Sequence, residues 1–325
     1  MKKVILAHRY SEEAVELLRR EFRLVIADDE GGLAACLRRH PDAEALVAFL
    51  SDPLDGAAIQ SMKKLKLIAN FAVGYNNIDV ARALERNVLV THTPDVLTGA
   101  TADLAMALLL AVSRRLVEGD AFVRSGRFRG WDAGLLLGKE LDGAILGIVG
   151  MGRIGLATAL RARAFGMKVV FYSRSAKPRI EKKFGFARVT FLELIRSADV
   201  VSLHLPYSPG VRHLFNRDVF ALMKRDAIFI NTARGPLMDE AALAMALEKN
   251  ELFGAGLDVY EDEPLVNGKL TGLKNAVLLP HLGSATAATR RQMAMMTVQA
   301  VREALGGKHP RHLIPEWKEK LKKRA

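Results

Sequence analysis

Short apolar runs alternate with amphipathic segments along most of the chain. In the first third, segments with helical spacing separate five such runs, VILAH, RLVIAD, ALVAF, KLIANF and VLVTHT. A second series begins near residue 144 with AILGIVG and continues through KVVFYS, VVSLHLP, AIFINTA, GAGLDVY and AVLLP. Strands that alternate with helices form parallel sheets covered on both faces. The pattern predicts an α/β protein with two doubly wound parallel-sheet domains.

A mainly helical region joins the two series. It runs from about Thr98 to Arg124 and contains the longest apolar run, Leu104 to Val112. That run is far shorter than the ~20 residues that a membrane-spanning helix needs. We therefore expect a buried helix here and no membrane partner. A final helix is predicted from about Ala285 to Leu305, and a basic tail follows it.

Composition narrows the class of protein. The 325 residues suffice for about two domains. The net charge is +12, but the basic residues are mostly scattered among acidic ones, which favours a solvated surface over nucleic-acid binding. The single cysteine, Cys36, excludes an internal disulfide and a cysteine-rich metal site, and it fits the cytoplasm. We expect a soluble cytoplasmic protein without a metal.

A glycine-rich segment opens the second series. It has the pattern GxGxxG, it follows an apolar strand and it precedes a helix rich in Ala and Leu; its residues are Gly150, Met151, Gly152, Arg153, Ile154 and Gly155. In this context the glycines permit a tight turn, close approach of a pyrophosphate and packing of the helix on the strand. The pyrophosphate would lie at the positive end of that helix. The segment predicts dinucleotide binding, although a lone GxGxxG could be a plain turn.

The next predicted strand, in VVFYSRS, ends at residues that indicate which dinucleotide binds. NAD-binding proteins usually have an acidic residue here, which accepts hydrogen bonds from the ribose and would repel a 2′-phosphate. This chain has Ser173, Arg174 and Ser175 instead. An arginine–phosphate contact is charge-assisted, and serine hydroxyls donate to phosphate oxygens. We expect NADP(H) to be preferred and NAD(H) to be possible; an exposed arginine without a ligand is the alternative.

Three chemically active side chains follow later strands. Arg234 comes just after an apolar strand, in NTARGP; Glu263 follows Asp258 in GLDVYEDEP; and His281 follows a third strand, in VLLPHLGS. Ligands of an open parallel sheet bind beyond the carboxyl ends of its strands. Singly, each side chain could be a turn residue, a solvated charge or a satisfied histidine. Their shared position after a dinucleotide fingerprint favours an active site.

These motifs together resemble those of the D-isomer-specific 2-hydroxyacid dehydrogenases, and most closely the glyoxylate/hydroxypyruvate reductases. The resemblance covers nearly the whole chain through NFAVGYNNIDV, LTGATADLAMALLL, LGIVGMGRIG, LHLPYSPGVRHLFN, INTARGPLMDE, GLDVYEDEP and LPHLGSAT. It implies that Arg234, Glu263 and His281 are the catalytic residues. It also implies a substrate-binding set of Ala72, Val73, Gly74 and Arg234. Further cofactor-lining residues implied by the resemblance are Thr101, Thr232, Ala233, Asp258, His281 and Gly283.

The resemblance also implies a domain arrangement. Residues 1–98 and 286–325 would form a flavodoxin-like substrate domain, and a Rossmann cofactor domain, residues 99–285, would be inserted between them. A homodimer is implied as well, with the helix from Thr98 and the segment around Trp131 as its contact. The side chains expected to set the width of the substrate pocket are Leu50, Phe71 and a residue near Trp131 of a second subunit.

The expected reaction is the reduction of small 2-oxo acids, such as glyoxylate and hydroxypyruvate, to 2-hydroxy acids. A nicotinamide supplies a hydride, and His281 supplies a proton because imidazole titrates near neutral pH. Glu263 would orient His281 and favour its charged form. Arg234 would bind the substrate carboxylate and polarise the carbonyl.

Other functions fit parts of the pattern. NAD(H)-sensing corepressors look similar along the chain and act by recruiting partners, but Ser173 and Arg174 depart from an NAD preference. Phosphoglycerate dehydrogenases also look similar, and they often carry a C-terminal regulatory domain for which this chain has no residues. A corepressor-like binding protein and another D-2-hydroxyacid dehydrogenase therefore remain the alternatives.

Overall fold

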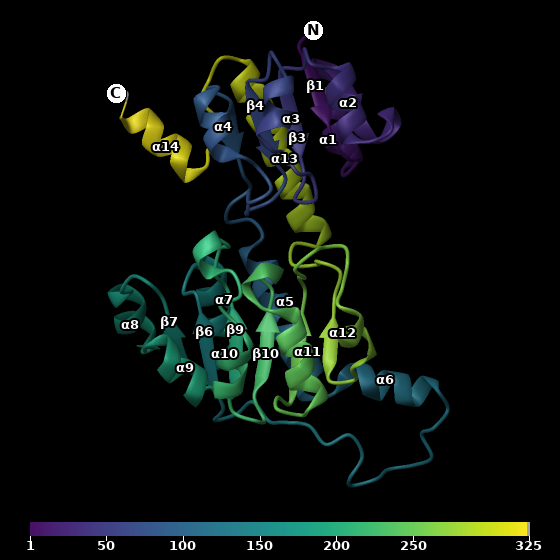
Figure 1. Ribbon diagram of the computed structural model, residues 1–325, viewed down its shortest axis with the longest axis vertical. Coiled ribbons are helices and arrows are strands. Elements are labelled where there is room, and N and C mark those ends of the chain that lie inside the picture. Colours follow the sequence, from purple (N-terminus) through teal and green to yellow (C-terminus); the bar gives the residue numbers. More distant parts are fainter. Residues whose placement is uncertain (324–325) are drawn as a thin grey trace. The chain divides into compact units, whose positions relative to one another are not determined.

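The computed structural model describes residues 1–323, which form two compact units. Unit 1 consists of Met1–Leu97 and of the chain from Ala285 onward, and unit 2 is Thr98–Ser284. Each unit is built on a parallel sheet with helices on both faces (Figure 1). This architecture confirms the predicted fold class of two doubly wound α/β domains.

The sheet of unit 1 has five strands in the flavodoxin-like order β2-β1-β3-β4-β5. These strands are β1 (Lys3–Leu6), β2 (Arg23–Ile26), β3 (Ala45–Ala48), β4 (Leu67–Asn70) and β5 (Leu89–Thr91). The helices of this unit are α1 (Glu12–Glu21), α2 (Leu33–Arg39), α3 (Gly56–Ser61), α4 (Val80–Glu85), α13 (Ala287–Leu305) and α14 (Pro315–Lys322). A short 3-10 helix, η1 (Ala27–Glu30), follows β2.

Alternating strand residues of unit 1 enter two separate cores. Val4 and Leu6 belong to the core formed with α1 and α13, and Ile5 between them belongs to the core formed with α2 and α3. Trp317 of α14 joins the second core, and its Nε1–H donates to the main-chain oxygen of Val88 at 2.8 Å. The tail that the sequence showed only as basic therefore forms a helix packed on unit 1.

The sheet of unit 2 has seven strands in the order β12-β11-β10-β9-β6-β7-β8. They are β6 (Ile145–Val149), β7 (Lys168–Tyr172), β8 (Ala187–Arg188), β9 (Val200–Leu203), β10 (Ile228–Asn231), β11 (Gly254–Leu257) and β12 (Ala276–Leu278). The helices are α5 (Thr98–Ser113), α6 (Leu116–Arg124), α7 (Arg153–Ala164), α8 (Pro178–Phe184), α9 (Phe191–Ser197), α10 (Arg217–Leu222), α11 (Glu240–Glu248) and α12 (Gly268–Gly272). Two 3-10 helices are η2 (Pro209–Val211) and η3 (Gly235–Leu237).

The strand order of unit 2 is that of a Rossmann fold with one more strand at its edge. Ile228 and Ile230 of β10 belong to the core formed with α5 and α7, whereas Phe229 belongs to the core formed with α9, α10 and α11. The order of the strands reverses between β6 and β9, which pair directly. In such sheets ligands bind beyond the carboxyl ends of the strands at this reversal.

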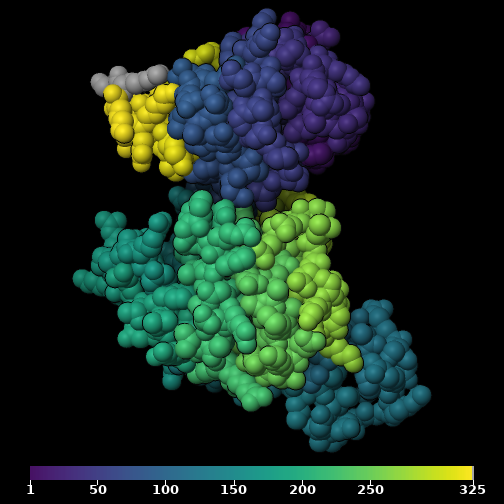
Figure 2. All heavy atoms as spheres, in the orientation of Figure 1, coloured from purple at the N-terminus to yellow at the C-terminus, as the bar shows by residue number. Residues whose placement is uncertain are grey.

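The helix expected over residues 98–124 is two helices. The break falls at Arg115, whose main chain is left-handed with φ of 51° and whose guanidinium bonds Glu118 in the next turn. The main-chain oxygen of Ser113, at the end of α5, accepts the N–H of Lys139 at 2.8 Å. The segment that starts with α6 protrudes from the body of unit 2 in Figure 2. The sequence predicted helix throughout this range and did not indicate the break.

Candidate active site

The glycine-rich turn lies at the carboxyl end of β6. Gly150 has φ of 106°, and a Cβ atom on it would lie 2.6 Å from the main-chain oxygen of His204 at the end of β9. A Cβ atom on Gly155 would lie 2.2 Å from the oxygen of Gly150. Both positions therefore require glycine for packing, independent of any ligand.

Gly152 differs from its two neighbours. A Cβ atom there would meet nothing within 4 Å, and Gly152 caps α7 without a side-chain hydrogen bond. The first N–H groups of a helix have no partner within the helix, and they carry its partial positive charge. Open space at this helix end fits the pyrophosphate of a dinucleotide. Met151 is buried in the core formed with α5 and α7, and Arg153 and Ile154 start α7.

The strand end after β7 is a structured turn. The buried Ser173 donates its hydroxyl to the main-chain oxygen of Ser175 at 2.7 Å, so this hydroxyl is committed to the turn. Arg174 and Ser175 are exposed. Arg188 in β8 donates to the main-chain oxygen of Ser173 at 3.0 and 3.2 Å and to that of Arg174 at 3.4 Å. A second guanidinium thus lies beside the turn, and the sequence did not point to it.

Further polar groups lie at the same edge of the sheet. Thr101 in α5 donates its hydroxyl to the main-chain oxygen of Gly283 at 3.0 Å. The side chain of Asn231 spans the turn after β10, because its Oδ1 accepts the N–H of Ala233 and its Nδ2 donates to the oxygen of Arg234, both at 3.0 Å. The hydroxyl oxygen of Thr232 is buried and finds no hydrogen-bond partner within residues 1–323. A buried, unpaired hydroxyl fits a polar ligand at this edge.

Arg234 follows β10 in a turn fixed by its neighbours. Its Nη1 donates to the main-chain oxygen of Ala233 at 2.6 Å. Burial lowers the pKa of Arg234 from its ordinary value, and the charge of Glu263 opposes this effect. Arginine keeps its charge at neutral pH in spite of such shifts. The result is a partly buried cation that a carboxylate ligand could pair with.

Glu263 and His281 are in direct contact. The Nδ1 atom of His281 lies 2.8 Å from Oε2 of Glu263, and Oε1 of Glu263 accepts the N–H of Tyr260 at 3.0 Å. Burial raises the pKa of Glu263, but the hydrogen bond and charge of His281, with the Tyr260 N–H, outweigh it and leave the pKa below its ordinary value. Glu263 is therefore ionised at neutral pH and bonds one nitrogen of the imidazole.

Asp258 fixes the main chain just after His281. Its two carboxylate oxygens accept the N–H groups of Leu282 at 2.6 Å and of Gly283 at 2.8 Å. His281 itself has a left-handed main chain, with φ of 54°, which is uncommon outside glycine. Burial raises the pKa of Asp258, although the two N–H groups act in the opposite direction. Asp258 thus holds His281 in a conformation that histidine seldom adopts.

The turn at Ala72, Val73 and Gly74 belongs to unit 1 and directly follows β4. The main-chain oxygen of Ala72 accepts the N–H of Thr93 at 2.9 Å. Leu50 and Phe71 also lie in unit 1 and are partly exposed, and Phe71 packs against Phe49 with ring centroids 5.1 Å apart.

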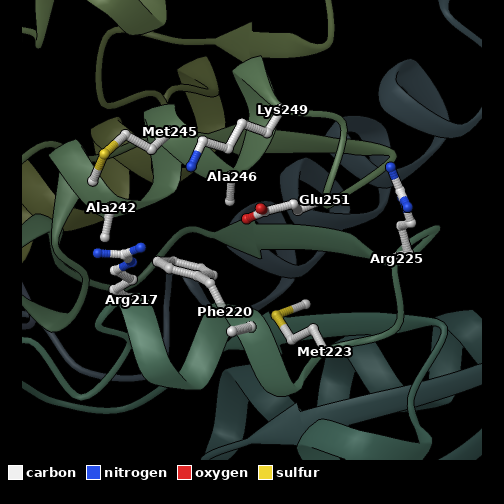
Figure 3. A pocket seen from close by; sticks show the side chains of 10 residues that line it. Arg217, Phe220, Met223, Arg225, Ala242, Met245, Ala246, Lys249 and Glu251 are labelled. Carbon is white, nitrogen blue, oxygen red and sulfur yellow. The ribbon is translucent and has the colours of Figure 1, made fainter.

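A hollow of about 410 Å³ lies over α10 and α11 and is lined by charged side chains such as Arg217, Lys249 and Glu251 (Figure 3). Arg174, Arg234, Glu263 and His281 do not line it.

Among residues 1–323, no group of three or more His, Cys, Asp or Glu side chains could hold a metal, and no helix is long and apolar enough to cross a membrane.

The chain matches known proteins over almost its full length. A glyoxylate reductase of Thermococcus litoralis is 43% identical over 318 residues, which are 96% of each chain. A solved structure from Thermus thermophilus is 44% identical with a TM-score of 0.89 and covers 96% of this chain and 99% of its own. An NADPH-dependent glyoxylate/hydroxypyruvate reductase of Sinorhizobium meliloti, solved with NADP and malonate, is 31% identical with a TM-score of 0.87 and covers 97% of each chain.

The family is identified by a match within the part of the chain that is predicted to bind the cofactor. Residues 106–283 match the model of the NAD binding domain of the D-isomer specific 2-hydroxyacid dehydrogenases. The matched range includes the glycine-rich turn, the strand end after β7 and the His281–Glu263 pair. The full-length relatives extend the match to unit 1. The chain therefore belongs to the family of D-isomer-specific 2-hydroxyacid dehydrogenases.

Proposed function

We propose that this protein reduces glyoxylate and hydroxypyruvate to the corresponding 2-hydroxy acids with a nicotinamide dinucleotide. The contact between His281 and Glu263 carries the proposal, because it pairs an imidazole with an ionised carboxylate in the field of a partly buried cation, Arg234. Relatives named glyoxylate reductase and glyoxylate/hydroxypyruvate reductase support this choice of substrate.

His281 is the proposed acid and base. Reduction adds a hydride to the carbonyl carbon, which a bound reduced nicotinamide supplies, and a proton to the carbonyl oxygen. Glu263 bonds Nδ1 of His281 and so leaves Nε2 as the nitrogen that delivers the proton. Asp258 fixes the main chain on which this imidazole is placed.

Arg234 and the turn at Ala72, Val73 and Gly74 are the proposed carboxylate-binding groups. A guanidinium binds a carboxylate with two parallel hydrogen bonds and also stabilises negative charge that develops on the carbonyl oxygen. Main-chain N–H groups of Val73 and Gly74 are proposed to donate to the carboxylate as well. A guanidinium and main-chain N–H groups each favour a substrate with a carboxylate next to the reacting carbonyl. Leu50 and Phe71, with a residue near Trp131, are the proposed determinants of substrate size.

The proposed cofactor is NADPH, with NADH as a weaker substitute. Arg174 and Ser175 lie exposed at the strand end where NAD-binding proteins place an acid, and Arg188 adds a second positive charge to the same turn. The remaining proposed cofactor-lining residues are Thr101, Gly150, Met151, Gly152, Arg153, Ile154, Gly155, Ser173, Thr232, Ala233, Asp258, His281 and Gly283. Crystals of the Sinorhizobium meliloti enzyme with NADP support this choice by similarity.

A homodimer and a cytoplasmic location complete the proposal. The protruding segment exposes several large apolar side chains, with Trp131 87% exposed; the others are Leu116, Val117, Val123, Phe128 and Leu137. Such a surface favours burial against another copy of the chain. Light scattering of the purified protein tests the dimer. The buried Cys36, whose pKa burial raises to about 11, suits the reducing cytoplasm.

A turnover assay with NADPH and glyoxylate tests the function. An active enzyme should oxidise NADPH only when glyoxylate or hydroxypyruvate is present, and His281→Ala should lower kcat by several decades while NADPH still binds. A protein that binds the dinucleotide tightly but turns over none of these acids would reject the proposal and favour the corepressor-like alternative.

A further inference from the structure

We infer that His92 is a positioning residue that aims the main-chain N–H of Gly74 at the substrate carboxylate. Its Nδ1 atom lies 3.1 Å from the main-chain oxygen of Val73. A carbonyl oxygen only accepts hydrogen bonds, so Nδ1 carries the proton in this contact. The inference rests on the proposed function, which assigns the carboxylate to this turn.

Because a peptide group is planar, the contact of His92 with the Val73 oxygen also fixes the direction of the Gly74 N–H. The oxygen of Val73 and the N–H of Gly74 belong to the same trans peptide, in which they point in opposite directions. A donor that holds the oxygen therefore fixes the direction of the N–H. His92 holds that oxygen on one side of the turn, and the N–H of Gly74 must face the other side.

The neighbouring peptides of the turn are held in the same way. The main-chain N–H of Thr93 donates to the oxygen of Ala72 at 2.9 Å, which directs the N–H of Val73. The Nδ2 of Asn70 donates to the oxygen of Gly74 at 2.8 Å. Three consecutive carbonyl oxygens are thus anchored by three different donors, and the N–H of Val73 and of Gly74 donate to no acceptor within residues 1–323.

His92 is itself held in place. Its main-chain N–H donates to the oxygen of His312 at 3.1 Å, in a segment that continues into α14. Its ring meets the ring of Tyr75 edge to face, with centroids 5.8 Å apart. The hydroxyl of Tyr75 in turn donates to the carboxylate of Glu316 at 3.1 and 3.3 Å. The imidazole therefore reaches the oxygen of Val73 from a fixed base within unit 1.

Of the three anchors, His92 can be altered with least damage to the core. The donor at Thr93 is a main-chain group, and Asn70 is completely buried at the end of β4. His92 is only partly buried. An asparagine at this position places an amide N–H₂ where the imidazole has Nδ1, whereas leucine has a similar shape without a donor. The pair His92→Asn and His92→Leu therefore isolates the hydrogen bond.

The experiment compares these two variants with the wild-type protein. Loss of the donor in His92→Leu should raise KM for glyoxylate about tenfold, as loss of one well-placed hydrogen bond does, while kcat changes by less than about threefold. His92→Asn should keep KM within about threefold of the wild-type value. Oxalate, a stable dianion, should bind the NADPH-loaded Leu variant about tenfold more weakly in calorimetry. NADPH affinity should be the same in all three proteins.

Controls separate this role from general stability. His312→Leu makes the same replacement at a histidine that meets His92 through its main-chain oxygen, and it should leave KM unchanged. If His92→Leu does not fold, His92→Asp replaces it, because it has the shape of asparagine but no N–H. Equal KM values for the Asn and the donor-free variant would overturn the inference, as would an unchanged KM in both. Failure of the wild-type protein to reduce glyoxylate would instead reject the proposed function.

Discussion

The Nδ1 atom of His281 lies 2.8 Å from Oε2 of Glu263, whose other oxygen accepts the N–H of Tyr260. Because both carboxylate oxygens are engaged, the carboxylate cannot rotate away from the imidazole. The hydrogen bond with His281 contributes to the lowered pKa of Glu263, so the carboxylate stays ionised at neutral pH although burial acts against this. The chain thereby fixes both the direction of the imidazole and the charge beside it.

The first prediction concerns pH. The pKa of Glu263 lies below its ordinary value, so the ionised carboxylate stabilises the folded chain at neutral pH, and this contribution is lost as pH falls through the pKa of the folded state. Glu263→Gln removes the carboxylate, so the free energies of unfolding of the two proteins should differ most at neutral pH and converge at acid pH. Chemical denaturation of both proteins from neutral pH down to about pH 3 measures this difference. A difference that stays constant over this range would show that the charge of Glu263 does not stabilise the fold.

The second prediction concerns Gly152, the one glycine of the turn that packing does not require. Gly152→Ala adds a Cβ atom in open space, so the variant should fold with a wild-type melting temperature. The same atom lies at the helix end proposed to receive the pyrophosphate, so NADPH affinity should fall about tenfold or more. Gly210→Ala, which also meets nothing within 4 Å, is the matched control and should bind NADPH normally. Normal binding by Gly152→Ala would place the dinucleotide elsewhere.

The third prediction concerns cofactor choice. A charge-assisted hydrogen bond contributes about 1.5–3 kcal/mol, so NADPH should be preferred over NADH by roughly ten- to a hundredfold in kcat/KM. Arg174→Ala should weaken NADPH by most of this factor and leave NADH almost unchanged. Arg217→Ala, at the hollow over α10 and α11, which Arg174 does not line, is a control for the loss of a positive charge. A wild-type preference for NADH would contradict the assignment of the strand end.

Much of the fold was predictable because its strands are apolar and buried. Six of the seven strands of unit 2 coincide with runs that the sequence singled out. The exception is β8, which has two residues, both exposed, and therefore no apolar pattern. The break at Arg115 was also invisible, since a left-handed residue between two helices leaves no periodic signal.

The site was predictable in position but not in contacts. Strand ends placed Arg234, Glu263 and His281 at one edge of a sheet, yet only the structure shows that Glu263 bonds His281. Arg188 lies 15 residues from Ser173 in the chain, and their contact depends on the pairing of β8 with β7. No motif distinguishes such a residue from other basic surface residues. The same holds for His92, which directly follows β5 and contacts the main-chain oxygen of Val73 only in the folded structure.

The fourth prediction concerns Asp258. Asp258→Asn puts an amide N–H₂ against the N–H of Leu282 or of Gly283, where a carboxylate oxygen now accepts. Loss of a buried hydrogen bond to a charged group should cost about 1–3 kcal/mol of stability. The left-handed main chain of His281 should relax, so kcat should fall at least about tenfold with little change in KM. Chemical denaturation and steady-state kinetics measure both effects; a variant with reduced stability but full kcat would limit Asp258 to a structural role.

The last prediction concerns the substrate. Arg234 is a partly buried cation after β10, and a substrate without a carboxylate would not supply the anion that this cation is proposed to bind. Sites built around such a group reject analogues that lack its partner far more strongly than analogues that differ by one methylene. Simple aldehydes should therefore react at least about a hundredfold worse than the matching 2-oxo acids, with NADPH held constant. Discrimination among small 2-oxo acids should be modest, because one methylene is worth about 1–3 kcal/mol, with glyoxylate and hydroxypyruvate ahead of pyruvate.

A matched variant makes this substrate test specific. Arg234→Lys keeps the positive charge but loses the two parallel hydrogen bonds, so it should lose activity with glyoxylate while its weak rate with aldehydes changes little. Equal rates for aldehydes and acids in the wild-type protein would mean that Arg234 binds no carboxylate, and the proposed reaction would fail. If the carboxylate is required but a bulky 2-oxo acid is preferred, the chemistry assigned to Arg234 and His281 stands. In that case only the proposed substrates are wrong, and the side chains of Leu50 and Phe71 are the first to vary.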